Sequence, residues 1–253
     1  MIIRQTHDSF IMIKQHDHAF LSGEIVKNFN TSLLKSDQHF EEMTYAAYQH
    51  DRSWIGLDDT PIWNDGDNIP YTFSDYPLLP KMAFYRIGLD EIEKVSPYAA
   101  LLCSMHFHSF FTKSKKPDCI AFMNEESKRQ GRLKKLFPRL DEDLLHQHFL
   151  LLQFSDDLSL YMCLNEPGVT KKEEHPWFKE GFKNTELFNE GGGRLYGEWL
   201  NDKEIRVGTF PFKTDFSVTL QFKNVLKTAI HEKGIAAAYE TAEMKEKSLR
   251  IIK

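Results

Sequence analysis

The spacing of apolar residues along the 253-residue chain mostly predicts helices. Two short apolar runs at 2–4 and 10–13 flank a polar Thr6-His7-Asp8 turn, a pattern typical of a hairpin. From about Ala19 onward, apolar residues recur at helical spacing, and Ser96-Pro97 has the composition of a helix start. Further helices are expected over residues 37–54, 88–95, 97–111, 119–136 and 140–160.

The segments outside these helices differ in character. Residues 58–80 are interrupted by proline and glycine and predict a long loop, either an ordered lid or binding loop or a disordered segment. After residue 165 the pattern changes to short alternating runs, which predict a small antiparallel sheet within the segment 166–222. A closing helix is expected in residues 223–253. The expected fold is therefore mainly α, with residues 1–253 as a single domain: a helical core at 14–165, a β-containing insertion at 166–222 and the C-terminal helix.

Composition narrows the classes of partner. Hydrophobic residues make up 41% of the chain and charged residues 27%, as in ordinary soluble domains. A net charge of −5 and a pI near 6.1 argue against a nucleic-acid binder. We find no signal-peptide pattern and no apolar run of about 20 residues, so a cytoplasmic protein without a membrane partner is expected. The three cysteines are predicted to be reduced, and the oligomeric state stays open.

Candidate chemistry comes from polar residues placed among apolar ones. His18, the adjacent His50-Asp51 pair and Asp156 all lie in or at the ends of predicted helices with apolar neighbours. Burying such groups costs free energy unless they are paired or bound to a cation. Imidazole and carboxylate ligands together suit borderline divalent metals such as Fe, Mn, Zn or Ni. The sequence therefore predicts one metal site formed by these four residues.

Two pairs of neighbouring residues offer alternative candidates for the metal site. His106 and His108 lie about 200° apart on a helix, so both cannot face one site. We prefer His106, which shares the apolar face of its helix. Because His106 could be a further ligand, the site could hold either one ion or two. Asp156 is preferred over Asp157 from its place after an apolar run. The remaining histidines are expected at the surface or as helix caps: His7, His39, His146, His148, His175 and His231.

The order of these residues resembles the HD-domain superfamily of metal-dependent phosphohydrolases. The matching segments are HAFLSGEIV, AAYQHDRSWIG and LLLQFSDDLSLY, so this resemblance covers about residues 14–165. The segments IMIKQHDHAFLSG and SPYAALLCSMHFHSFF are more closely similar to an uncharacterised bacterial family known only as a domain of unknown function. The chain has Arg52-Ser53-Trp54 after the HD pair and no adjacent His-His, which leaves the number of ions open.

The HD resemblance implies an HD-like helical bundle that hydrolyses a phosphate ester of a small molecule. His18, His50, Asp51 and Asp156 would be metal ligands, and His106 would be the additional ligand of members with two metals. Asp51 could also hold the attacking water. Arg52 is the candidate phosphate contact, because a guanidinium binds oxygens in pairs. Two alternatives stay open: a di-iron oxygenase of the HD type, and a non-catalytic protein that binds a metal or ligand.

Overall fold

Seven helices and a six-stranded sheet form the fold in the computed structural model, which describes residues 1–189 and 191–253. With 47% helix and 17% strand, the chain is a mixed α/β protein. The helices are α1 (Gln15–Lys27), α2 (Phe40–Gln49), α3 (Leu78–Val95), α4 (Pro97–Ser109), α5 (Pro117–Lys134), α6 (Glu142–Leu164) and α7 (Lys227–Thr241). The strands of the sheet are β1 (Ile2–Gln5), β2 (Ser9–Ile13), β5 (Gly197–Trp199), β6 (Glu204–Val207), β7 (Phe216–Leu226) and β8 (Met244–Ile252). A separate two-stranded pair consists of β3 (Trp63–Asn64) and β4 (Ile69–Pro70).

The sheet joins strands from both ends of the chain in the order β1-β2-β7-β8-β6-β5. Neighbours are antiparallel except for β6 and β8, which run parallel. Strand β7 pairs with β8 over residues 216–223 and with β2 over residues 223–226, so it links the N-terminal hairpin to the other strands. The β1–β2 pairing confirms the hairpin that the sequence predicts.

The expectation of a mainly α bundle with a small β appendage is wrong. The strands predicted within 166–222 belong to a curled six-stranded sheet that also takes in β1, β2 and β8. The C-terminal helix ends at Thr241, and residues 244–252 form a strand. In β8 only Leu249 and Ile251 are buried, and the charged residues around them resemble a solvated helix end. Helices α1 to α6 and the sheet share one hydrophobic core, and α7 packs with β2 and β7 in a second, smaller cluster.

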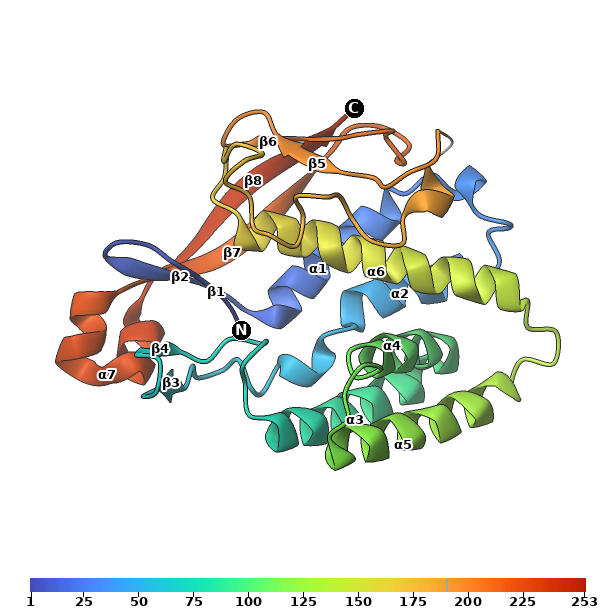
Figure 1. Ribbon diagram of the computed structural model, residues 1–253, viewed down its shortest axis with the longest axis horizontal. Helices are drawn as coiled ribbons and strands as arrows, with labels where there is room; N and C mark the ends of the chain where they lie inside the picture. Colours follow the sequence, from blue (N-terminus) through green and yellow to red (C-terminus); the bar gives the residue numbers. More distant parts are fainter. Residues whose placement is uncertain (190) are drawn as a thin grey trace.

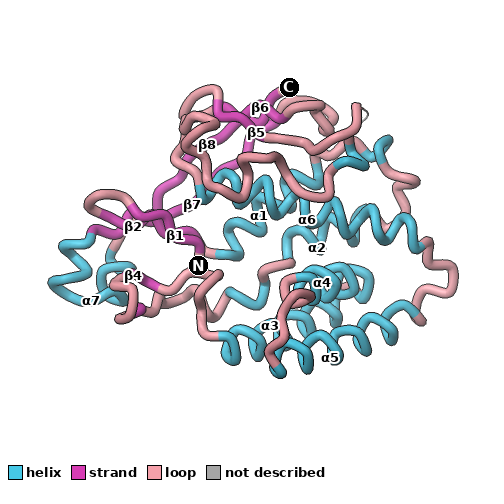
Figure 2. The backbone as a smooth tube through the Cα atoms, in the orientation of Figure 1, coloured by secondary structure: helices cyan, strands magenta, loops and turns pink. Residues whose placement is uncertain are grey.

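Helices α1 to α6 form two groups beneath the sheet, whereas α7 lies apart, next to β7 and the N-terminal hairpin (Figure 1). Helix α1 contacts both α2 and α6, and it also packs on β7, whereas α6 reaches β1. Helices α3 and α5 flank α4 on the side away from the sheet, as the tube in Figure 2 also shows. The Ser96 side chain accepts a hydrogen bond from the Ala99 amide at the start of α4, which confirms the predicted helix start. None of the described helices combines the length and the apolar composition needed to cross a membrane.

Close contact between α1 and α2 depends on Gly23. The aromatic ring of Tyr48 occupies the space where a side chain at Gly23 would begin, and an added Cβ would overlap that ring. Helix α1 carries His18 and α2 leads into His50, so this contact joins the two helices that supply these imidazoles.

Gly23→Ala is expected to lower the free energy of unfolding by about 1–3 kcal/mol, because the extra carbon overpacks the helix interface. Gly131→Ala is the matched control: Gly131 lies in α5, and a Cβ there would meet no atom within 4 Å. This control should gain about 0.5–1 kcal/mol from helix propensity. Denaturant titration measures both changes, and equal stability of the two variants would contradict the proposed close contact.

Candidate metal centre

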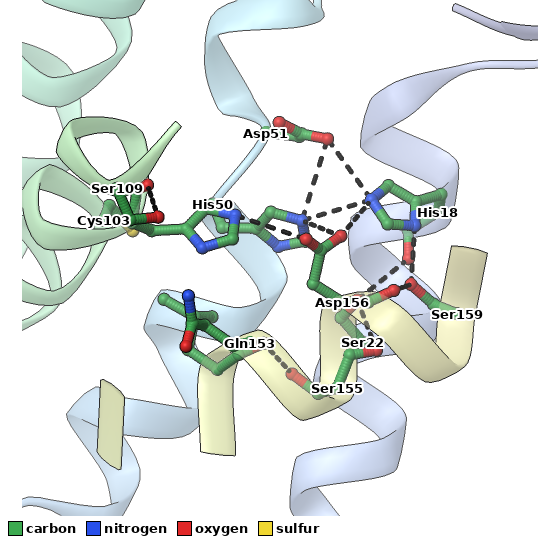
Figure 3. Close-up of polar contacts among 12 residues, drawn as sticks. His18, Ser22, His50, Asp51, Cys103, Ser109, Gln153, Ser155, Asp156 and Ser159 are labelled. Carbon is green, nitrogen blue, oxygen red and sulfur yellow. Dashed lines mark hydrogen bonds and ion pairs between the residues drawn. The ribbon is translucent and has the colours of Figure 1, made fainter. Parts of the chain in front are cut away.

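The five side chains predicted as metal ligands converge from four helices. His18 lies in the first turns of α1, His50 and Asp51 directly follow α2, His106 is near the end of α4, and Asp156 lies inside α6. All five residues are buried, with exposed fractions between 0% and 9%. Figure 3 shows His18, Asp51 and Asp156 pointing toward one another. The structure thus brings together the whole predicted set, whose binding of an ion stays a prediction.

The Nε2 atoms of His18 and His50 each lie within 3.7 Å of an oxygen of both Asp51 and Asp156. The Nε2 atoms of His18 and His50 are 3.2 Å apart. Asp156 Oδ1 lies 3.1 Å from the first and 3.4 Å from the second. Asp51 Oδ2 lies 3.3 Å and 3.7 Å from the same two nitrogens. Atoms about 2.1 Å from one ion in tetrahedral or octahedral geometry are separated by about 3.0–3.4 Å, so this donor set fits a divalent metal.

His106 extends the cluster on its other side. Its Nε2 atom lies 3.3 Å from Asp156 Oδ2, the oxygen that does not face His18. Two groups with metal-binding geometry therefore overlap: His18 with His50 and Asp51, and His50 with His106 and Asp156. The Nδ1 atom of His106 is buried and has no hydrogen-bond partner among residues 1–189 and 191–253.

Hydrogen bonds behind the two central imidazoles direct their Nε2 atoms inward. His50 Nδ1 lies 2.8 Å from the carbonyl oxygen of Ala47, which can only accept, so this nitrogen carries the proton. Ser159 Oγ donates to the carbonyl oxygen of Asp156 and lies 2.6 Å from His18 Nδ1, from which it accepts. In both rings Nε2 is left with a lone pair for a cation, and the partner fixes the orientation of the ring.

Without a cation, protons balance the charge of the two carboxylates. Burial lowers the pKa of His18, but hydrogen bonds to Asp156 and Asp51 raise it overall to about 9. The pKa of His50 is also raised, because the Asp51 and Asp156 carboxylates outweigh the effect of burial. Burial would raise the pKa of Asp156, yet its contacts with His106, His18 and His50 hold it well below the ordinary value. A metal would therefore have to displace protons from these imidazoles.

A cavity of about 570 Å³ opens onto the cluster, and His18, Asp51, His106 and Asp156 form part of its wall. The loop predicted at 58–80 contributes Phe73, so this segment is a part of the site. The chain also places Gln15 there, which donates from Nε2 to Asp51 Oδ2 at 3.0 Å.

Arg52 does not lie at this cavity, contrary to the role predicted for it. Its Nε donates to Glu91 at 2.7 Å and its NH1 group donates to Gln49. The cationic residues that do line the cavity are Lys81 and Lys116. Lys81 is absent from the residues predicted for the site, because the only sign of its role in the sequence is its place in an apolar turn of a helix. Lys116 is the last residue of the basic run Lys113-Ser114-Lys115-Lys116.

The histidines outside the predicted ligand set differ in their positions and burial. His108 lies apart from the cluster, with its Nε2 atom 3.5 Å from Ser127 Oγ. His148, expected at the surface or as a cap, is fully buried, and its Nδ1 atom lies 2.8 Å from the Tyr98 hydroxyl. Burial lowers the pKa of His148 to about 4, so it is a neutral core residue. Asp157, beside Asp156, lines the cavity, and burial raises its pKa to about 7.

A family model described as "Protein of unknown function (DUF3891)" matches residues 1–227, most of the chain. The chain belongs to the DUF3891 family. No curated protein and no solved structure matches it. The described cluster of buried histidines and aspartates lies within the matched part of this DUF3891 chain and could bind a metal.

Ser159→Ala is expected to weaken metal binding by about 10–100-fold, because His18 loses the partner that fixes its ring. Ser155→Ala is the matched control: Ser155 is buried in the same helix, but its hydroxyl donates to the Leu152 carbonyl and does not touch a candidate ligand. Competition with a metal-binding dye measures the two affinities. Equal losses in both variants would mean that the effect is general damage to α6.

The metal-free protein is expected to lose stability as the pH rises from about 6.5 to about 9. His18 has a raised folded-state pKa of about 9 against an ordinary value of 6.5, so its proton stabilises the fold below pH 6.5 and is lost through pH 9. Metal binding needs neutral imidazoles, so the increase in Tm caused by Ni²⁺ should grow over the same range. Thermal scans of chelator-treated protein with and without Ni²⁺ test both trends. The control His146→Gln, at an exposed position, should show the same two trends. A Tm that does not change with pH in the chelated protein would contradict the raised pKa of His18.

Proposed function

We propose that this protein is a metal-dependent hydrolase of the HD type that acts on a phosphate ester. The observation that supports it is the convergence of His18, His50, Asp51 and Asp156: each imidazole Nε2 atom lies 3.1–3.7 Å from an oxygen of both carboxylates, and His18, Asp51 and Asp156 line a cavity large enough for a substrate. Their order along the chain resembles that of the HD superfamily. The proposed cofactor is a divalent Fe, Mn, Zn or Ni ion, since the donor set mixes imidazole and carboxylate.

When bound, such a cation would lower the pKa of water and polarise a phosphoryl oxygen. The protein's own part is to hold the ligands and orient the reacting groups. His18 and His50 present their Nε2 atoms because Ser159 and the Ala47 carbonyl hold the opposite nitrogens. Asp51 lines the cavity and is itself oriented by Gln15, so its carboxylate is placed to accept a proton from an attacking water.

A second candidate is an oxidative reaction at two metals. The group of His50, His106 and Asp156 favours it, because Asp156 offers one oxygen to each side of the cluster. Elemental analysis of the purified protein distinguishes these cases through metal identity and stoichiometry. One equivalent of metal per chain supports the hydrolase, whereas two equivalents of iron with oxygen consumption would favour the oxygenase.

Asp51→Ala and Asp156→Ala are expected to lower bound metal from about one equivalent to near zero. The rate of hydrolysis of a generic phosphate monoester should fall by more than about 100-fold. This is a larger loss than is expected when a residue that only hydrogen-bonds to a metal ligand is replaced. Asp59→Ala is the control, because Asp59 is exposed and pairs only with Lys14 in the described structure. Metal content, thermal unfolding and activity are measured for each variant. Folded Asp51→Ala protein with unchanged metal and activity would reject the proposal.

A further inference from the structure

Apart from the candidate metal ligands, the wall of the cavity is rich in aromatic rings. Phe73, Phe110, Phe111 and Trp177 line it, together with Tyr85. These rings come from separate parts of the chain: the loop before α3, the helix α3 itself, the end of α4 and the segment after α6. Hydrolysis at the metal cluster does not require them, so they are free to determine which substrate is bound.

Two of these rings are large apolar groups left in contact with solvent. Phe110 is 50% exposed and Trp177 is 48% exposed, although both line the cavity. Trp177 meets Phe73 edge-on with ring centroids 6.2 Å apart, and Phe110 meets His106 at 4.6 Å. Exposed aromatic side chains gathered at a cavity are typical of a binding surface, and ring faces bind other planar rings.

Lys81 adds a positive charge to the same cavity. It is only 9% exposed, and its Nζ donates to the Phe73 carbonyl at 3.1 Å. No carboxylate within 4.0 Å pairs with it in the described parts of the chain, and burial lowers its pKa. A buried ammonium without an anionic partner costs free energy that a bound anion would offset. Lys116, also at the cavity, adds to the attraction of anions.

We infer that the substrate is a phosphate monoester whose alcohol carries an apolar aromatic ring. The phosphate would lie between the metal cluster and Lys81, and the ring among Phe73, Phe110 and Trp177. The cavity of about 570 Å³ has room for such a molecule, well beyond the size of phosphate alone. This inference rests on the proposed hydrolase function. In the reaction, the oxygen of water bonds to phosphorus as the P–O ester bond breaks, and a proton passes to the departing alcohol oxygen.

Binding of two non-hydrolysable probes tests the inference without relying on turnover. Phenylphosphonate and methylphosphonate are titrated calorimetrically into metal-loaded protein. Phenylphosphonate should bind at least about tenfold more tightly, since only it can stack on the rings. Trp177→Ala and Phe110→Ala should remove most of this preference and leave methylphosphonate binding unchanged. The control is Tyr196→Ala, a ring that is 48% exposed and does not line the cavity.

Lys81→Met should weaken both probes by about tenfold or more, because both carry the anionic group. The control is Lys113→Met, an exposed lysine outside the cavity. If Lys81→Met does not fold, the variants at the exposed rings still decide the question. Equal affinities for the two probes overturn the inference, even when metal-dependent hydrolysis is observed. Ring-dependent binding without any hydrolysis supports the assigned ligand and contradicts only the hydrolase proposal.

Discussion

The buried carboxylate of Asp156 is the group on which the rest of the site depends. One of its oxygens faces His18 and His50, and the other faces His106. A carboxylate that is 9% exposed needs a positive partner, because its desolvation would otherwise destabilise the fold. In the metal-free protein, protonated imidazoles supply that charge, and a divalent cation can replace those protons. Metal binding and proton release are therefore linked at this residue.

A short chain of hydroxyl groups links helices α1 and α6 beside this carboxylate. Ser22 in α1 and Ser159 in α6 lie 2.9 Å apart through their Oγ atoms, and Ser159 also contacts both His18 and the Asp156 carbonyl. All three hydroxyl contacts are buried between the two helices. Small side chains at this interface let α1 and α6 approach closely, so the packing of the helices and the orientation of the ligands have the same cause.

The sequence predicts the cluster of buried histidines and aspartates better than it predicts the fold. A histidine or aspartate among the apolar residues of a predicted helix can be recognised from its sequence neighbours. For that reason His18, His106 and Asp156 can be predicted from the sequence as candidate ligands. The sheet depends on pairing between segments more than 200 residues apart, such as β2 and β7, which no local pattern reports. Strand β8 buries only two of its nine residues, and most of the others are charged or polar, so the alternation of apolar and polar residues typical of a strand is hard to recognise. Cavity residues such as Lys81 and Trp177 come together only through tertiary structure.

The sheet is a structural support for the site, through its contacts with α6. Tyr161, five residues after Asp156, stacks on Trp199 of β5 with ring centroids 6.0 Å apart. Its hydroxyl donates to the buried Glu174, which pairs with Lys171, and Lys171 in turn donates to the Gly197 carbonyl of β5. These contacts fix the part of α6 that follows the ligand. Tyr161 lies about 140° round α6 from Asp156, so the sheet packs on a different face of the helix from the ligand and helps to fix the helix that carries it.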